Sequence, residues 1–351
     1  MSLTRITATD AAASLESFDA IIDARTESEY AEDRLPGAVN WPSLHDDERR
    51  IVGTQYKQVS DFEARRIGAA MVARNIAGHL QQHAQDKPMG WRPLVYCWRG
   101  GKRSGTLAWF LDQIGFRVHM LEGGYKAFRR AVVTGLATVP RQLEFRVVCG
   151  RTGSGKTRLL QALAAEGGQV LDLEAIARHR GSVLGLLPGR PQPTQKAFET
   201  QIWDALRRFD PRRPVFVESE SRKVGNLRVP EVLIERMRRD SVCLNVEMPD
   251  EARVRLLLED YAFFADDLAL FCRQLDALVE LRGREVVNRW QALARSGRWA
   301  EAYADLMREH YDPTYLKSMQ RNFAGFDSAR RIELEDGSPA TLTRAARALL
   351  A

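Results

Sequence analysis

Cys149-Gly150-Arg151-Thr152-Gly153-Ser154-Gly155-Lys156-Thr157 decides the fold of the second half of the chain. A strand-like run, residues 145–148, precedes this stretch, and a helical pattern, residues 158–164, follows it. Residues 150–157 match G-x-x-x-x-G-K-[ST] in the strand–loop–helix context that this pattern requires. The glycines let backbone N–H groups turn inward, the helix N-terminus adds partial positive charge, and Lys156 supplies a full charge. The stretch therefore predicts a phosphate-cradling P-loop.

The predicted diphosphate-binding residues of this loop are Gly150, Gly153, Ser154, Gly155, Lys156 and Thr157. Thr157 is also a candidate ligand for Mg²⁺, because the hydroxyl at this position of the motif reaches the ion. The structural alternative is a glycine-rich turn that ends in a basic residue. A pyrophosphate of any kind fits the loop, so the motif does not choose between a nucleotide and another diphosphate.

A second polar segment follows the apolar run 214–217, where Glu218, Glu220 and Arg222 stand close together. An apolar strand that ends in a carboxylate is where a P-loop protein carries its metal-binding acid. Glu218 and Glu220 alternate along the expected strand and should face opposite ways, so we expect one of them to point into the site. Arg222 adds positive charge suited to phosphates. The alternative is an acidic strand end solvated at the surface.

The composition places broad limits on the class of protein. A chain of 351 residues with 44% hydrophobic residues predicts two or three globular domains. The net charge of +6 fits a polyanionic partner, but it fits an ordinary basic protein almost as well. The four cysteines are far apart, which argues against a disulfide framework or structural zinc. With no apolar leader or membrane-length apolar run, we expect a cytoplasmic protein without a membrane segment.

Alternating strand and helix patterns in the first 133 residues predict a mostly parallel α/β sheet, with its site at the carboxyl ends of the strands. The chemical focus is Cys97, which follows the strand pattern 93–96 and opens a glycine-rich loop. Cations and inward-facing amides favour the thiolate, so Cys97 is the candidate nucleophile rather than a small buried hydrophobe. The loop residues Arg99, Gly100, Gly101, Lys102 and Arg103 are the candidate binding site for an oxyanion.

Four segments carry a resemblance to the rhodanese domain: residues 22–25, 35–40, the Cys97 loop and 121–125. The resemblance covers roughly residues 5–132. One departure concerns the loop. Sulfur-transferring rhodaneses place four residues between the cysteine and the closing arginine, whereas five separate Cys97 from Arg103 here. That wider spacing is typical of phosphatases on the same fold, and it accommodates a phosphate or a selenium-bearing donor equally well.

From residue 249 onward the pattern is helical, with aromatic residues interspersed among arginines. Arg282, Arg284, Arg289, Arg295 and Arg298 lie near Trp290 and Trp299 in the sequence. This composition is typical of a surface that contacts RNA. It is equally typical of a solvated basic helix, and the sequence leaves both interpretations open.

The order of a rhodanese-like domain and a P-loop domain resembles that of the bacterial tRNA 2-selenouridine synthase family over essentially the whole chain. The most specific matches are residues 96–104, 150–157 and 218–225. Residues 53–58 and 62–68 also resemble the family's insertion between early rhodanese elements. The resemblance implies an α/β fold in two parts. These are an N-terminal rhodanese-like parallel-sheet domain and a C-terminal P-loop NTPase-like domain with a helical extension.

The resemblance also implies a substrate and a reaction: 2-thiouridine at the wobble position of tRNA is S-geranylated from geranyl diphosphate, and selenium from selenophosphate then replaces the geranylthio group. Lys156 and the P-loop would hold the diphosphate. Cys97 would act in the second step, with Arg99, Lys102 and Arg103 binding the phosphate portion. The expected partners are this tRNA and a supply of selenophosphate. No tightly bound cofactor is expected, and Mg²⁺ on Thr157 with Glu218 or Glu220 remains open.

Two other classes of enzyme remain open from the sequence. The Cys97–Arg103 spacing allows a phosphatase, and the P-loop allows an enzyme or kinase driven by ATP or GTP. A non-enzymatic RNA-binding module would leave both loops idle. The expected boundaries are a rhodanese-like domain at 1–133, a linker at 134–140, a P-loop domain at 141–248 and a helical region at 249–351 that packs on the P-loop domain.

Overall fold

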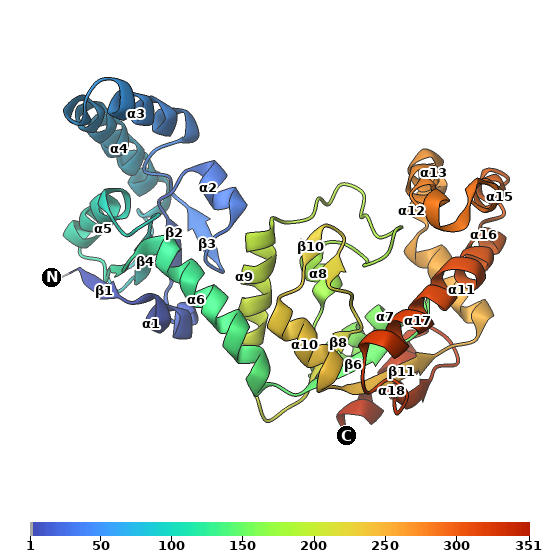
Figure 1. Cartoon of the computed structure of the whole chain (residues 1–351). Coiled ribbons are helices and arrows are strands. Elements are labelled where there is room, and N and C mark those ends of the chain that lie inside the picture. The colour runs from blue at the N-terminus through green and yellow to red at the C-terminus, as the bar shows by residue number, and fades with distance from the viewer. Residues whose placement is uncertain (1–2) are drawn as a thin grey trace. The chain divides into compact units, whose positions relative to one another are not determined.

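A computed structural model describes residues 3–351, and its contacts divide the chain into two compact units (Figure 1). The first unit contains residues 1–135 and 193–204, and the second contains residues 136–192 and 205–351. Each unit is built on its own five-stranded parallel sheet, so the predicted fold class of two α/β parts is confirmed. Among the described residues, no helix is long and apolar enough to cross a membrane.

The sheet of the first unit has the strand order β1-β5-β4-β2-β3. Its strands are β1 (Thr4–Ile6), β2 (Ala20–Asp23), β3 (Ala38–Asn40), β4 (Pro93–Tyr96) and β5 (His119–Leu121). Its helices are α1 (Ala8–Ala13), η1 (Leu15–Ser17), α2 (Glu27–Glu32), α3 (Asp46–Gln58), α4 (Asp61–His83), α5 (Lys102–Ile114) and α6 (Gly124–Thr138). Helices α3 and α4 lie side by side as a hairpin (Figure 1).

Helix α9 (Gln195–Leu206) packs with the first unit through most of its length, although it follows the P-loop in the sequence. The indole of Trp203 lies edge-on to Phe128 of α6 at 5.4 Å, and a Cβ on Gly135 would lie only 2.4 Å from the Trp203 ring nitrogen. Thr200 donates a hydrogen bond to Asp33. The sequence pattern gave no sign of this exchange, because an amphipathic helix does not reveal which sheet it covers.

Residues 134–140, expected as a linker, are helical in the structure. Helix α6 continues to Thr138, and the short turn η2 (Val139–Gln142) completes the passage into the second unit. Val132 and Leu136 are buried on one face of α6. This packing stabilises the helix across residues 134–138, although their sequence is typical of a turn.

The second sheet has the order β12-β11-β6-β8-β7, and every pairing is parallel. Its strands are β6 (Phe145–Cys149), β7 (Gln169–Leu171), β8 (Val215–Glu218), β11 (Val242–Glu247) and β12 (Arg330–Glu333), and a small hairpin joins β9 (Lys223–Val224) to β10 (Leu227–Arg228). Four helices of the second unit alternate with these strands along the chain or follow the last of them: α7 (Lys156–Ala165), α8 (Leu173–Ala177), α10 (Glu231–Arg239) and α18 (Pro339–Leu350).

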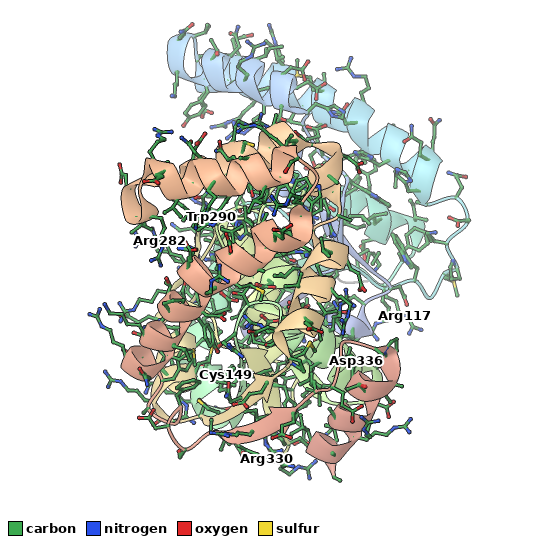
Figure 2. All side chains as sticks on the ribbon, turned by 90° about the vertical axis from the view of Figure 1, so that its right-hand side faces the viewer. Arg117, Cys149, Arg282, Trp290, Arg330 and Asp336 are labelled. Atoms are coloured by element: carbon green, nitrogen blue, oxygen red, sulfur yellow. The ribbon has the colours of Figure 1, made fainter. Side chains whose placement is uncertain are left out.

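The remaining elements form the predicted helical region. They are α11 (Asp250–Asp260), α12 (Phe263–Asp266), α13 (Leu268–Asp276), α14 (Val279–Arg282), α15 (Arg284–Arg295), α16 (Trp299–Leu306), the π-helix η3 (Met307–Tyr311) and α17 (Asp312–Asn322). Trp290, labelled in Figure 2, is fully buried in their shared core. Strand β12 was not expected from the sequence. Its signal was the alternation of buried Ile332 and Leu334 with exposed charged residues, which is typical of an edge strand.

A buried ion pair holds the centre of the first unit. Asp23, the last residue of β2, accepts hydrogen bonds from Arg25 at 2.6 Å and from the Tyr96 hydroxyl at 2.7 Å. Arg25 also donates to the carbonyl of Asp33, and its guanidinium lies 4.0 Å from the centre of the Tyr125 ring. Both charged side chains are essentially inaccessible to solvent, so each needs the other to compensate its lost hydration.

We expect Asp23→Ala to lower the free energy of unfolding of the first unit by about 3–5 kcal/mol, because Arg25 would remain buried without its counter-ion. Chemical denaturation followed by circular dichroism measures the change. Asp61→Ala is the matched control: it removes the carboxylate of an exposed pair with Arg65, which is worth less than about 1 kcal/mol. Equal effects of the two substitutions would contradict this account.

Candidate active site

The Cys97 loop joins the carboxyl end of β4 to the N-terminus of α5. The Cys97 thiol is buried, and the Ser104 hydroxyl donates a hydrogen bond to its sulfur at 3.1 Å. The backbone N–H groups of residues 98–101 donate no hydrogen bond within the described chain. A buried sulfur below a ring of free N–H donors is the arrangement that binds an oxyanion beside a nucleophile.

The start of α6 holds this loop from behind. The N–H of Tyr125 donates to the carbonyl of Cys97 at 2.8 Å, and the N–H of Lys126 donates to the carbonyl of Trp98 at 3.0 Å. Gly124 makes this approach possible: its φ is +57°, and a Cβ there would lie 2.2 Å from the Cys97 carbonyl oxygen. The segment 121–125 therefore acts by fixing the loop's carbonyls, which leaves its N–H groups free.

We expect Gly124→Ala to destabilise the first unit by several kcal/mol, because it adds a backbone clash to the strain of a left-handed conformation. Gly37→Ala is the matched control, since Gly37 has a φ of +72° but open space around its Cβ position. That substitution carries only the conformational strain, about 1–2 kcal/mol. Urea denaturation of both variants measures the difference, and equal losses would show that the clash is relieved.

The cations of the loop fall into two groups. Arg99 and Lys102 are exposed and form no ion pair with any described residue. Arg103 instead pairs with Glu29 of α2 at 2.6 Å, and its carbonyl accepts from Ser43. Burial tends to raise the pKa of Glu29, but the hydrogen bond and charge of Arg103, together with the Thr26 N–H and the charge of Arg25, outweigh burial and lower the pKa. Sequence reasoning missed Glu29, which orients the arginine that closes the loop.

The P-loop lies between β6 and α7, as its motif predicts. Gly150, Gly153 and Gly155 all have positive φ, and the Lys156 ammonium donates to the carbonyls of Gly150 at 2.8 Å and Arg151 at 3.3 Å. The structure thus gathers the predicted diphosphate-binding residues in one loop. Cys149, labelled in Figure 2, ends the strand that feeds it and is buried.

Two side chains from the helical region hold the P-loop, and sequence reasoning missed both. The fully buried guanidinium of Arg253 donates two hydrogen bonds to the carbonyl of Thr152, at 2.9 and 2.7 Å, and pairs with Asp312 at 2.5 Å. The Tyr315 hydroxyl accepts a hydrogen bond from the Gly150 N–H at 2.5 Å. A buried arginine with no sequence motif is recognisable only once its partners are known.

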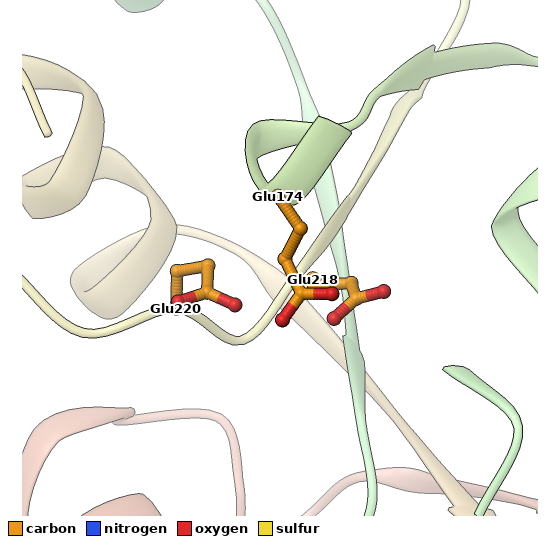
Figure 3. Close-up of side chains that lie close together, drawn as sticks. All are labelled: Glu174, Glu218 and Glu220. Carbon is orange, nitrogen blue, oxygen red and sulfur yellow. The ribbon is translucent and has the colours of Figure 1, made fainter. Parts of the chain in front are cut away.

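Three carboxylates converge beside this loop: Glu174, Glu218 and Glu220 (Figure 3). Their nearest oxygens all lie within 4.8 Å of one another. The expectation that Glu218 and Glu220 face opposite ways is wrong. Residues two apart on a strand lie on the same face, so the alternation of a strand does not separate these two carboxylates. Strand β8 ends at Glu218, where the N–H of Glu220 donates to the Glu218 carbonyl, and both side chains still reach the cluster. Sequence reasoning also missed Glu174, which follows β7.

The charge of this cluster is incompletely balanced. Burial raises the pKa of Glu218 despite the nearby Lys156, and burial together with the Glu218 carboxylate raises the pKa of Glu220 to about 8. Burial and the two neighbouring carboxylates raise the pKa of Glu174 well above its usual range. One oxygen of Glu218 is buried without a hydrogen-bond partner, and the Thr157 hydroxyl donates to Glu174 at 3.4 Å. This donor set fits a divalent cation with oxygen ligands.

Arg222 is exposed and forms no ion pair with the described residues.

The raised pKa of Glu220 predicts a pH-dependent stability in the absence of divalent metal. Between the unfolded pKa, about 4.3, and the folded pKa the folded chain retains a proton that the unfolded chain has lost. The free energy of unfolding should therefore fall as the pH rises through this window and level off above about pH 8. Denaturant midpoints measured in EDTA across the window test this.

Glu220→Gln keeps the shape of the side chain but cannot ionise, so it should flatten that pH dependence. Glu235→Gln on the exposed face of α10 is the control and should leave the wild-type slope unchanged. A Glu220→Gln variant with the wild-type slope would show that Glu220 does not carry the extra proton.

The arginines of the helical region are largely occupied within the fold. Arg282 donates to His310 and Thr314, Arg289 pairs with Glu309, and Arg298 pairs with Glu301. Trp290, one of the two aromatics that suggested an RNA-contacting face, is buried in the core, and so is Tyr303 of α16. These contacts favour the structural interpretation of this segment.

Two family models match the chain. The model of the tRNA 2-selenouridine synthase AAA domain matches residues 143–278, and that of the rhodanese-like domain matches residues 7–131. The tRNA 2-selenouridine synthase of Nitrosomonas europaea is 32% identical, over 86% of this chain and 89% of that protein. The protein of the same description from Hydrogenovibrio crunogenus is 32% identical, over 88% and 91%. That from Sulfurovum sp. is 30% identical, over 86% and 89%.

Proposed function

The chain belongs to the tRNA 2-selenouridine synthase family, and from this premise we propose that it converts wobble 2-thiouridine in tRNA to 2-selenouridine in two steps. It is an enzyme, and its family makes tRNA the substrate class. The observation that carries the two-step proposal is the presence of two separate loops suited to phosphate groups. One of these loops contains a buried thiol, and the other contains a lysine and a carboxylate cluster.

The first step is S-geranylation at the P-loop. The sulfur of 2-thiouridine attacks the terminal carbon of geranyl diphosphate, the carbon–oxygen bond breaks, and diphosphate leaves while the base loses a proton. Gly150, Gly153, Ser154, Gly155 and Lys156 would hold the diphosphate. Their N–H groups and the Lys156 ammonium would stabilise the charge that develops on the leaving group.

Thr157, Glu174, Glu218 and Glu220 would hold Mg²⁺ beside that diphosphate. The fit rests on the buried, unpartnered oxygen of Glu218 and on the all-oxygen donor set. A bound Mg²⁺ supplies positive charge that neutralises the departing diphosphate. No other cofactor is proposed, since geranyl diphosphate and selenophosphate are consumed as substrates.

The geranyl chain needs an apolar surface close to the P-loop. A cavity of about 10 Å³ lies between Thr152 of the loop and Leu257, Tyr261 and Leu306 of the helical region. This volume holds only about one water molecule, so a ten-carbon chain would have to displace its walls. Leu184, from the glycine-rich segment after α8, forms one of these walls.

The second step takes place at the Cys97 loop. A carbon–selenium bond forms at C2 of the base, the carbon–sulfur bond breaks, and geranylthiol leaves, while water takes up the phosphoryl group of selenophosphate. Arg99, Gly100, Gly101, Lys102 and Arg103 would bind that phosphoryl group. Cys97, at the base of the loop, would hold the selenium of selenophosphate in place by contact, and no bond to its sulfur forms in this exchange. We place this chemistry in the cytoplasm, together with the tRNA and the supply of selenophosphate.

A phosphatase is the second candidate, because Cys97 and Arg103 are separated by the five residues typical of that class on this fold. Release of phosphate from an aryl phosphate in the absence of tRNA would favour it. A nucleotide-driven reaction at the P-loop would instead require nucleotide-dependent phosphate release.

The proposal predicts a separate defect for each loop. Purified variants receive 2-thiouridine tRNA and geranyl diphosphate, then selenophosphate, and the digested nucleosides are measured by mass spectrometry. We expect Lys156→Ala to slow geranylation by about 10²–10³-fold, because a charge-stabilising donor is lost. Cys97→Ala should accumulate geranylthiouridine and form no selenouridine.

Lys57→Ala and Cys272→Ala are the matched controls, because both residues lie outside the two loops. Each should behave as the wild type does. A wild-type enzyme that leaves the nucleoside unchanged would overturn the proposal. Loss of geranylation in Cys97→Ala would overturn the division of labour between the loops.

A further inference from the structure

A groove of about 450 Å³ opens beside the Cys97 loop. The groove shares Gly100, Gly101 and Lys102 with the proposed oxyanion site, and the rest of its lining has no part in the chemistry described above. It runs from Gly100 and Gly101 along helix α5 to Trp109, with Arg5 of β1 and Met120 of β5 on the other side. A volume of this order accommodates a nucleotide-sized ligand. The groove lies entirely within the first unit.

One face of α5 forms the wall of this groove. Lys102, Gly105, Thr106 and Trp109 follow the spacing that places side chains on a single helix face, and all four line the groove. A Cβ on Gly105 would meet nothing within 4 Å, and its backbone conformation does not require glycine. The hollow therefore depends on the absence of a side chain at this position.

Trp109 is an aromatic side chain that the core does not need. The large apolar residues of α5 that serve the core, Leu107 and Leu111, are fully buried, whereas Trp109 is 53% exposed. Its ring lies edge-on to Phe110, with the centroids 4.9 Å apart, so a neighbouring ring supports it while more than half of its surface meets solvent. Exposed aromatic rings of this kind provide stacking platforms for unpaired nucleobases.

The charged residues of the groove favour a polyanion. Arg5 and Lys102 are exposed, and neither forms an ion pair with any described residue. No carboxylate is among the described residues that line the groove. Two free cations beside a stacking ring suit a sugar–phosphate backbone and its base better than an uncharged isoprenoid chain or a basic peptide.

We propose that this groove binds a single-stranded nucleotide that flanks the target uridine, with its base stacked on Trp109 and its phosphate between Arg5 and Lys102. The inference rests on the proposed function, because that function brings RNA to Cys97. Trp109 is a positioning residue: it holds the strand so that the adjacent uridine enters the Cys97 loop, and it takes no part in the chemistry.

The test measures binding of a fluorescently labelled tRNA anticodon stem-loop containing 2-thiouridine, by anisotropy at several salt concentrations. We expect Trp109→Ala to raise Kd about tenfold without changing the salt dependence, since base–aromatic stacking is lost and no charge is removed. Trp109→Phe should restore part of the affinity. Arg5→Gln should reduce the slope of log Kd against log salt by about one.

Gly105→Leu tests the groove without removing a contact. Leucine is a better helix former than glycine and meets open space, so the variant should fold at least as well as the wild type while weakening RNA binding. Phe62→Ala is the matched control, because Phe62 is also an exposed aromatic residue, 69% accessible, and lies outside the groove. It should bind RNA as the wild type does.

Unchanged affinity in both Trp109→Ala and Gly105→Leu would overturn the inference, as would a wild-type chain that does not bind the stem-loop. An effect of Trp109→Ala on the KM for geranyl diphosphate alone would assign the groove to the isoprenoid chain instead and also overturn it. If RNA binding depends on Trp109 but no selenouridine forms, the proposed reaction fails while the groove assignment stands.

Discussion

Both candidate sites depend on loops whose carbonyl oxygens are already occupied. In the first unit, backbone N–H groups at the start of α6 donate hydrogen bonds to the carbonyl oxygens of Cys97 and Trp98. The N–H donors of the Cys97 loop itself remain free. In the second unit, Arg253 donates a hydrogen bond to the carbonyl oxygen of Thr152, and Lys156 donates one to the carbonyl oxygen of Gly150. A loop whose carbonyl oxygens are already hydrogen-bonded needs little reorganisation when an anion binds to its N–H groups. Such preorganisation is the main source of electrostatic stabilisation in enzymes.

The carboxylate cluster beside the P-loop has the opposite character. Glu174, Glu218 and Glu220 crowd like charges into a poorly hydrated space, and one oxygen of Glu218 has no partner. An arrangement of this kind opposes folding, so a folded chain retains it where a function requires it. Proximity to Thr157 and Lys156 connects the cluster to the P-loop, and so to the diphosphate that we propose binds there, rather than to the stability of the sheet.

The sequence predicted those parts of the site in which the motif and the local backbone coincide. The P-loop and the Cys97 loop are each a continuous stretch of sequence, so the residues of each loop are necessarily close together in the fold. It did not predict Glu29, Glu174, Arg253 or Tyr315, which reach the loops from distant segments through side-chain contacts that leave no periodic signal. The prediction that Glu218 and Glu220 face opposite ways failed because residues two apart on a strand share a face, so the pattern itself places both carboxylates on one side. The exchange of α9 into the first unit likewise depends on contacts between Trp203 and α6 that an amphipathic pattern does not specify.

The distribution of unpaired charge indicates which part of the chain would attract RNA. The net charge of +6 is small, and arginines in the helical region are largely neutralised by neighbouring carboxylates and polar groups. Arg5, Arg99 and Lys102 form no such pairs, and all three lie at or beside the Cys97 loop. Electrostatic attraction acts through uncompensated charge, because paired charges cancel within a few ångströms. The same cations that would bind an oxyanion at the thiol would therefore also draw the RNA backbone toward it, which would couple capture of the substrate to its placement for reaction.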